Sequence, residues 1–189
     1  MTKKQPKRIG LAIIGAGRVG LIRGELAARH PQVDWIGIAE KNPERARLVA
    51  GKIGADFVTA DFRELVKRPE VTAAVVSTDE HLHVDPVLAC IERGLPMMIE
   101  KPLATDLAES AAVLASLEKA RVDAVIGYTQ RFRRRWLVAK EKVRTGQLGE
   151  VTMVTSRAFM NRLVAIDNYQ RSDNPAEIDR KSTRLNSSH

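Results

Sequence analysis

Three glycines near the N-terminus have the spacing of an anion-binding turn. The stretch IGLAIIGAGRVGLIRGELA holds them in the pattern GxGxxG, behind an apolar run typical of a buried strand and ahead of a helical pattern. In such a turn the first glycine permits a tight bend, the second lets main-chain amides approach a pyrophosphate, and the third lets the helix pack closely on the strand. A glycine-rich turn without a ligand is the alternative. We expect a dinucleotide-binding turn made of Gly15, Ala16, Gly17, Arg18, Val19 and Gly20.

An acidic residue follows at the distance that ribose recognition needs. Glu40 lies 20 residues beyond Gly20, at the end of the second expected strand. A carboxylate there accepts hydrogen bonds from ribose hydroxyls and repels a 2′-phosphate, which favours NAD over NADP. Lys41 is adjacent and could weaken that preference, so NADP stays possible. A merely solvated Glu40 is the other interpretation.

The elements that must position these residues alternate along the chain. Apolar, β-rich runs followed by helical patterns indicate βαβ units and a parallel sheet. Strands are expected over residues 9–14, 33–39, 56–58, 72–77, 97–99, 123–127 and 151–158, and helices over residues 18–29, 43–52, 62–68, 81–93, 106–120 and 134–144. We predict an α/β fold with a doubly wound parallel Rossmann sheet in residues 1–128.

Composition narrows the class of protein. The net charge of +8 is concentrated in a basic N-terminal arm, in Arg131 and in the arginines at 133–135, with few aromatic residues between the cations, so we expect no nucleic-acid partner. A binding module for nucleic acid built on the arginines is retained as an alternative. The apolar runs are too short to span a bilayer, and the start lacks the apolar region of a secretory signal. The single cysteine excludes an internal disulfide and a cysteine-rich metal site, so we expect a cytoplasmic protein without metal.

The last eleven residues do not read as part of a fold. DRKSTRLNSSH is polar, lacks hydrophobic periodicity and resembles a translated sequencing adapter. We expect residues 179–189 to be non-native, with an ordinary disordered tail as the alternative.

Three motifs together carry a family resemblance. With GAGRVG at 15–20, Glu100-Lys101-Pro102 and GYTQRF at 127–132, residues 8–178 resemble the Gfo/Idh/MocA oxidoreductases. The EKP motif and the stretch RFRRRWLVAKEKVRTGQLGEV are more specific than the glycine turn. The resemblance implies an NAD(P)-dependent dehydrogenase that moves a hydride between nicotinamide and a sugar, inositol or related polyol. It also implies that the Rossmann sheet is followed by a truncated α/β second domain, of which residues 129–178 would hold the linker helix and first strand. The sheet of that second domain would form a homo-oligomer.

The resemblance also implies roles for single residues. Lys101 would be catalytic, contacting the substrate hydroxyl and transferring its proton, with partial burial and the cationic nicotinamide favouring proton release. The bond to Pro102 is often cis in the family; a surface Lys-Pro turn is the alternative. Asp79 and Glu80 depart from the family's usual Pro and Asn. Lys101 would also contact the cofactor, and the remaining contacts would come from Ser77, Thr78, His83, Glu100, Gln130 and Arg131.

Some of these roles have alternatives, and the resemblance implies residues that this sequence does not contain. For His83 we expect a role in orienting the start of its helix rather than a catalytic role. Arg131 could pair with an anionic substrate group or a protein carboxylate. The family's downstream Asp and His do not occur before Ile178. We therefore expect this chain to be an inactive fragment of a dehydrogenase. A non-catalytic NAD(H)-binding sensor on the same fold is the alternative function.

Overall fold

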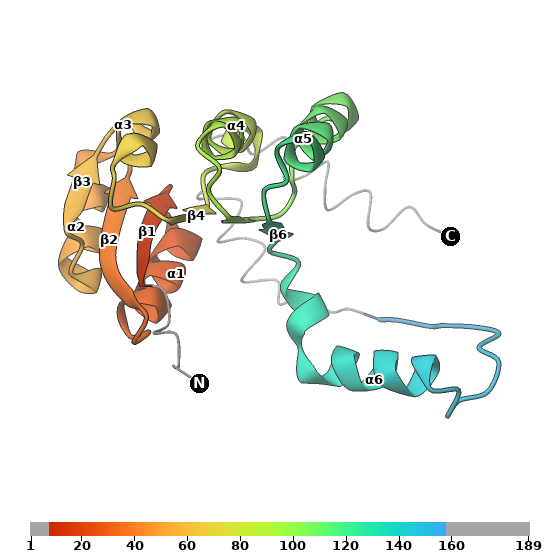
Figure 1. Ribbon diagram of the computed structural model, residues 1–189. Helices are drawn as coiled ribbons and strands as arrows, with labels where there is room; N and C mark the ends of the chain where they lie inside the picture. Colours follow the sequence, from red (N-terminus) through yellow and green to blue (C-terminus); the bar gives the residue numbers. More distant parts are fainter. Residues whose placement is uncertain (1–7, 158–189) are drawn as a thin grey trace, which may run out of the picture. The chain divides into compact units, whose positions relative to one another are not determined.

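Six strands form one parallel sheet in the computed structural model, which describes residues 8–157 (Figure 1). Their order is β3-β2-β1-β4-β5-β6, and every neighbouring pair is parallel. The strands are β1 (Ile9–Ile14), β2 (Val33–Ala39), β3 (Phe57–Thr59), β4 (Ala73–Val76), β5 (Met97–Ile99) and β6 (Ala124–Ile126). The α/β doubly wound sheet predicted from the sequence is confirmed.

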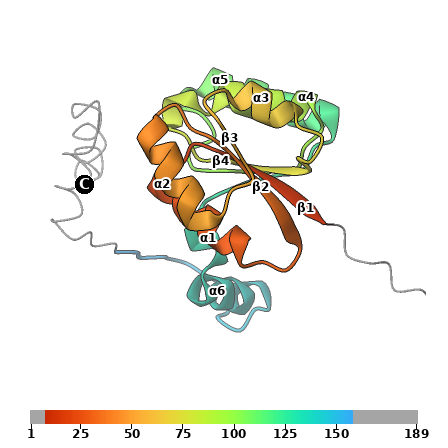
Figure 2. The same ribbon diagram turned by 90° about the vertical axis from the view of Figure 1, so that its left-hand side faces the viewer.

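Helices connect the strands and cover both faces of the sheet. α1 and α2 lie on one face, and α3, α4 and α5 on the other (Figure 2). The helices are α1 (Arg18–Ala28), α2 (Pro43–Ile53), α3 (Phe62–Lys67), α4 (Val84–Glu92), α5 (Leu107–Ala120) and α6 (Arg134–Arg144), with short 3₁₀ turns η1 (Glu80–Leu82) and η2 (Thr129–Phe132).

The helix expected over residues 81–93 is divided in the structure. η1 ends at Leu82, and α4 begins at Val84 after His83. Pro86 explains the division, because it has no N–H to donate to the carbonyl of Leu82 and its ring would clash with that carbonyl in a continuous helix. The expected boundary was wrong, and the interruption leaves His83 between two elements.

The chain reverses its winding direction beside β1. β2 and β3 lie on one side of β1, and β4, β5 and β6 follow on the other side. The loops that leave β1 and β4 therefore diverge, which opens a crevice at the carboxyl ends of these two strands. Ile14 pairs with Val76 in the register that joins the strands, so the segments from Gly15 and from Ser77 start at the same edge.

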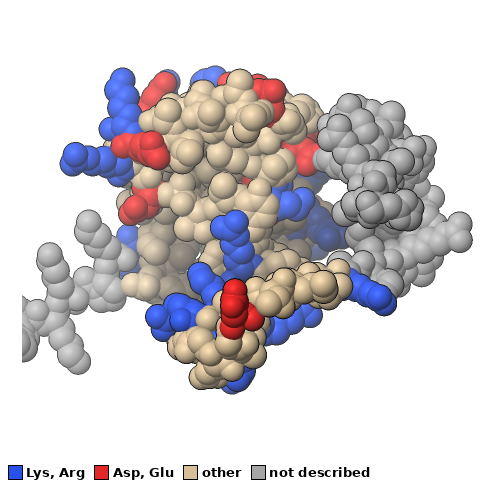
Figure 3. All heavy atoms as spheres, turned by 90° about the vertical axis from the view of Figure 1, so that its right-hand side faces the viewer, with Lys and Arg blue, Asp and Glu red and all other residues tan. Residues whose placement is uncertain are grey.

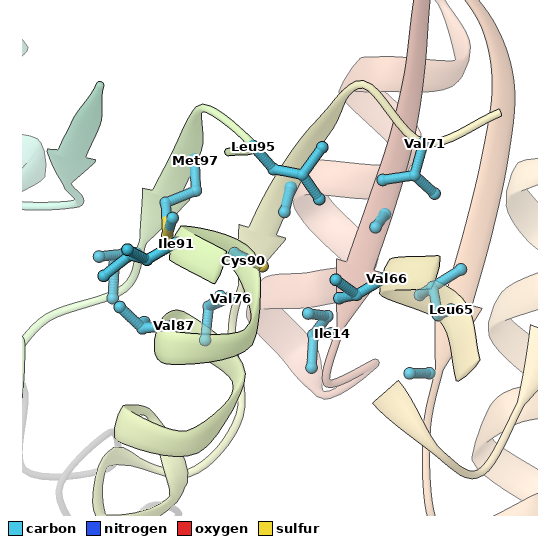
Figure 4. Packing of buried hydrophobic residues seen from close by; sticks show 14 of the residues in the cluster. Ile14, Leu65, Val66, Val71, Val76, Val87, Cys90, Ile91, Leu95 and Met97 are labelled. Carbon is cyan, nitrogen blue, oxygen red and sulfur yellow. The ribbon is translucent and has the colours of Figure 1, made fainter. Parts of the chain in front are cut away.

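The core consists of two apolar layers, one on each face of the sheet. Ile13 packs with Ile38 and Val49 in one layer, whereas Ile14, its neighbour in sequence, belongs to the other layer, because successive side chains of a strand point to opposite faces. Figure 4 shows this second layer, in which Ile14 and other labelled strand side chains pack beneath α3 and α4. Burying one such side chain contributes about 1.5–3 kcal/mol, so the core fixes the strand ends that carry the loops.

Cys90 on α4 is part of this second layer. It is fully buried, and burial raises the pKa of its thiol to about 12. The thiol therefore remains protonated at neutral pH and packs as a small apolar group.

The chain divides into two compact units between Leu137 and Val138. The second unit is described only to residue 157, and α6 crosses from the first unit into it. α6 is followed by Gly146, whose positive φ of 71° reverses the chain there. Figure 3 shows Lys and Arg side chains gathered around the α6 segment, with few acidic ones.

The strand expected over residues 151–158 is absent from its described part. Residues 151–157 have no regular secondary structure. A strand needs a neighbouring strand for its hydrogen bonds, and the described residues supply none for this segment. Residues 1–7 of the expected basic arm, residues 158–178 of the expected second domain and the tail at 179–189 lie outside the described residues. Within residues 8–157, no helix is both long and apolar enough to cross a membrane.

Candidate functional site

The turn between β1 and α1 has little space for side chains. Gly15 has a φ of 89°, and a Cβ there would lie 2.6 Å from the main-chain nitrogen of Thr78. A Cβ on Gly20 would overlap the carbonyl oxygen of Gly15. The first glycine is thus required by its backbone conformation, and the third by the close approach of α1 to the turn.

Gly17 differs from the other two because its side faces open space. It is the N-cap residue of α1, and a Cβ there would have no heavy atom within 4 Å. No side chain caps this helix, and its first turn has no acidic residue. The N–H groups that begin α1 therefore adjoin an open volume, an arrangement that suits a phosphate group. Ala16 is buried beside them, whereas Arg18 is exposed and Val19 is half-buried at the start of the helix.

The residues after β4 lie against this turn. The hydroxyl of Ser77 donates a hydrogen bond of 2.7 Å to the carbonyl of Gly15. Thr78 Oγ1 is buried without a hydrogen-bond partner among the described residues. Since a buried hydroxyl without a partner is unfavourable, Thr78 is the residue of this loop most suited to contact a ligand.

Glu40 extends from the end of β2 to the same turn. One carboxylate oxygen accepts the N–H of Ala16 at 2.9 Å, and the other accepts the N–H of Asn42 at 2.9 Å. Only 8% of the Glu40 side chain is exposed, and Arg45 Nη1 lies 3.6 Å from it. A carboxylate has about four lone-pair positions, so both oxygens can accept further hydrogen bonds.

These groups border one cleft of about 180 Å³. It brings together five of the residues predicted from the sequence: Gly15, Gly17, Glu40, Ser77 and Thr78. Phe62 and Leu82 add apolar surface to the lining, and Lys41, Arg45 and Asp79 add charge. Sequence reasoning missed the contributions of Arg45, Phe62 and Leu82; for Arg45 the available signal was its place in the first turn of the helix that follows Glu40.

Lys101 lies at the same edge of the sheet but does not line this cleft. It follows β5 and Glu100, whose N–H donates to the carbonyl of Val76. The bond from Lys101 to Pro102 is cis, as the family resemblance led us to expect. Lys101 is exposed among the described residues, so the partial burial that we expected for it is not seen there.

His83 connects two of the loops at this edge. It is buried, with Nδ1 at 2.7 Å from the carbonyl oxygen of Pro102 and Nε2 at 3.1 Å from that of Thr78. Each contact needs an N–H; a neutral imidazole satisfies one of them and an imidazolium satisfies both. This geometry supports the positioning interpretation of His83 rather than a direct contact with a cofactor.

The side chain of Glu100 is directed toward α1. Its Oε1 accepts hydrogen bonds from Arg23 Nη2 at 2.7 Å and Nε at 3.2 Å. Sequence reasoning missed Arg23, although its position three residues after Gly20 places it on the face of α1 that packs on the sheet. Glu100 therefore joins the end of β5 to the helix that follows the glycine turn.

The remaining predicted residues lie on η2, away from the cleft lining. Gln130 Oε1 accepts hydrogen bonds from Trp136 Nε1 at 3.2 Å and Arg135 Nη2 at 3.3 Å. The Arg131 guanidinium lies 5.3 Å from the centre of the Tyr128 ring. Both residues are exposed; Gln130 contacts the start of α6 and Arg131 contacts Tyr128, and neither lines the cleft at the glycine turn.

Comparison with known proteins agrees with this geometry. Residues 9–128 match the family GFO_IDH_MocA, described as "Oxidoreductase family, NAD-binding Rossmann fold". The chain belongs to the Gfo/Idh/MocA oxidoreductases. The predicted family, its α/β fold and an NAD-binding Rossmann domain are thereby confirmed.

Several relatives in the family are named as dehydrogenases. Myo-inositol 2-dehydrogenase of Thermotoga maritima is 32% identical over 152 residues, covering 79% of this chain and 45% of the relative. A levoglucosan dehydrogenase solved with NADH and levoglucosan is 26% identical with a TM-score of 0.71, covering 76% of this chain and 41% of the other. Scyllo-inositol dehydrogenase of Lactobacillus casei, solved with NAD(H) and scyllo-inositol, shares the fold at a TM-score of 0.72 and 21% identity, covering 77% and 44%. The chain spans less than half the length of these relatives.

Proposed function

We propose that the protein represented by this chain is an NAD(P)-dependent dehydrogenase acting on the CH–OH group of a sugar, inositol or related polyol, and that these residues form its cofactor half. The observation that carries the proposal is the cleft in which the glycine turn, Glu40 and the hydroxyl of Thr78 meet, a hydroxyl with no hydrogen-bond partner in the described part of the chain. The names of the relatives support the class of substrate.

The cleft fits the adenosine and diphosphate part of the cofactor. The open side of Gly17 would receive the diphosphate at the start of α1, and Glu40 would accept hydrogen bonds from the ribose hydroxyls. The apolar side chains of Phe62 and Leu82 would border the adenine. Thr78 Oγ1 would gain a polar partner.

The chemistry depends on one residue of this chain. A bound nicotinamide dinucleotide would supply the hydride-transfer chemistry at the carbinol carbon. Lys101 Nζ would take the proton of the carbinol hydroxyl as the C–H bond breaks, and would return it when a carbonyl is reduced. His83 would hold the loops of Thr78 and Pro102 in register, so that Lys101 is presented at the edge where the cofactor lies.

Binding and turnover are tested separately. We expect the purified chain to bind NADH, and Gly17→Leu to weaken binding about tenfold or more by filling the open side of the turn. Gly51→Ala, whose new methyl would lie in open space on α2, is the matched control and should leave binding unchanged. No NADH binding by the unsubstituted chain would refute the cofactor half of the proposal.

Turnover is expected only when the region corresponding to the rest of the relatives is present. We propose that the chain alone oxidises no inositol or levoglucosan. Lys101 is exposed, and no described residue encloses a substrate-binding pocket beside it. Formation of NADH by the chain alone would contradict this. In a protein completed with that region, Lys101→Gln should abolish turnover while NADH binding persists. If the completed protein with Lys101 unsubstituted binds NADH but shows no turnover, the non-catalytic sensor function is favoured instead.

A further inference from the structure

A second cleft lies on the surface formed by α3 and α4. These helices pack against each other on one face of the sheet (Figure 1, Figure 2). The cleft has a volume of about 410 Å³ and shares no lining residue with the cofactor cleft. Its lining consists of Arg63, Val66, Lys67, Ala89, Glu92 and Arg93. The proposed dehydrogenase function assigns no role to any of these residues.

Two rows of side chains border this second cleft. Arg63 and Lys67 are four residues apart on α3, and Ala89 and Arg93 are four residues apart on α4 and its C-cap, so the members of each pair lie on one side of their helix. Val66 is buried and Ala89 is half-buried. Cationic groups therefore lie on both helices, with apolar surface between them.

The lining carries a net positive charge. It contains three cations and one acid, Glu92. Asp85 Oδ2 lies 3.9 Å from Arg63 Nη2, which offsets part of the charge of Arg63. Lys67 and Arg93 are exposed, and neither forms an ion pair with another described residue. These two cations are therefore available to an anionic ligand.

The ends of the two helices place these cations on opposite sides of the cleft. Lys67 lies in the last turn of α3, and Arg93 is the C-cap residue of α4. The carbonyl groups at a helix C-terminus favour a cation there. The axes of packed helices are about 8–10 Å apart, so one small molecule with two anionic groups can contact both side chains.

We propose that the cleft between α3 and α4 binds a small molecule that carries two or more phosphate groups, held by Lys67 and Arg93. The guanidinium of Arg93 would bind one phosphate through two parallel hydrogen bonds, and the ammonium of Lys67 would attract another as a point charge. The part of the ligand between its phosphates would lie over Val66 and Ala89. The site is separate from the cofactor cleft and goes beyond the proposed function.

The test is isothermal titration calorimetry of this chain with tripolyphosphate. We expect binding in the unsubstituted chain and equal binding in Gly17→Leu, because the two clefts share no residue. Lys67→Gln and Arg93→Gln should each weaken binding about fivefold or more, and Glu92→Gln should tighten it about twofold or more. Inorganic phosphate should bind at least about tenfold more weakly than tripolyphosphate, because a single phosphate cannot contact both helices at once.

Lys52 provides a matched control. It is also exposed in the last turn of its helix, but that helix, α2, lies on the opposite face of the sheet (Figure 2). Lys52→Gln should change the affinity for tripolyphosphate by less than about twofold. Equal weakening by Lys52→Gln and Lys67→Gln would show diffuse attraction to a basic chain and would overturn the inference.

Three further outcomes would also overturn it. Tripolyphosphate binding that disappears in Gly17→Leu would assign the anion to the glycine turn. A polyglutamate peptide that binds more tightly than tripolyphosphate would indicate an acidic protein segment as the ligand. The absence of any tripolyphosphate binding would refute the site directly. NADH binding is measured separately, so none of these results bears on the proposed cofactor site.

Discussion

Arg23 Nη2 and Glu100 Oε1 lie 2.7 Å apart and join the helix after the glycine turn to the end of β5. The two side chains are 23% and 12% exposed, so the pair is largely withdrawn from water. A Cβ on Gly127 would lie 3.0 Å from Glu100 Oε2, which places the end of β6 against the same carboxylate. The ion pair therefore links the turn proposed to bind phosphate with the strand end that carries Lys101.

Removal of Arg23 should destabilise the fold. Arg23→Met leaves the carboxylate of Glu100 without its partner in a poorly hydrated place, and we expect the free energy of unfolding to fall by about 2 kcal/mol. Glu100→Gln should cost a similar amount, and the double variant less than the sum of the two. Urea denaturation of the four proteins measures this coupling.

The surface pair of Arg68 and Glu70 is the control for that cycle. Its shortest contact is also 2.7 Å, but the side chains are 39% and 36% exposed. Arg68→Met should therefore change the free energy of unfolding by less than about 1 kcal/mol. If Arg23→Met and Arg68→Met lower the free energy of unfolding equally, the burial of the Arg23–Glu100 pair adds nothing to its stabilising effect.

Replacement of His83 should loosen the two loops that it joins. His83→Ala leaves the carbonyl groups of Thr78 and Pro102 without their ring contacts and creates a cavity, so we expect a loss of about 2–3 kcal/mol in the free energy of unfolding. NADH binding should weaken as well, because Thr78 lines the cleft. His81→Ala, on the exposed 3₁₀ turn two residues earlier, should change neither quantity. An unaltered NADH affinity in a folded His83→Ala protein would show that His83 does not position the cofactor site.

Local patterns predicted the scaffold better than they predicted the contacts. Strands β1, β2 and β5 and helix α6 have the expected limits, because apolar runs, caps and breakers act within a few residues. The glycine turn was recognisable for the same reason. The pairing of Glu100 with Arg23, 77 residues apart, depends on how α1 lies on the sheet, and a pattern of single residues does not reveal it. Residues 151–157, the described part of another expected strand, have no regular structure, because a strand is stable only with a partner and the described residues supply none.

The buried thiol of Cys90 should make the free energy of unfolding depend on pH in the alkaline range. Its thiol has a pKa of about 12 in the folded chain, raised by burial from the ordinary value of 9.0. Above pH 9 the unfolded chain releases this proton while the folded chain keeps it, so folding stability falls by about 1.4 kcal/mol per pH unit until the folded thiol ionises. Cys90→Ala should be less stable at pH 8 because of its cavity but should lose less stability between pH 9 and 11. Parallel curves for the two proteins, from urea denaturation at each pH, would contradict the burial of the thiol.

Gly20 and Gly51 should respond in opposite directions to the same change. Gly20→Ala places a methyl group against the carbonyl of Gly15, so α1 must move away from the turn; we expect a loss of about 3 kcal/mol and weaker NADH binding. Gly51→Ala, in α2, places its methyl group in open space and replaces a poor helix former, so it should stabilise the chain by up to about 1 kcal/mol. Thermal unfolding with and without NADH measures both effects. A Gly20→Ala protein that is as stable as the unsubstituted chain would show that α1 does not approach the turn as closely as described, and the proposed phosphate site would lose its geometric basis.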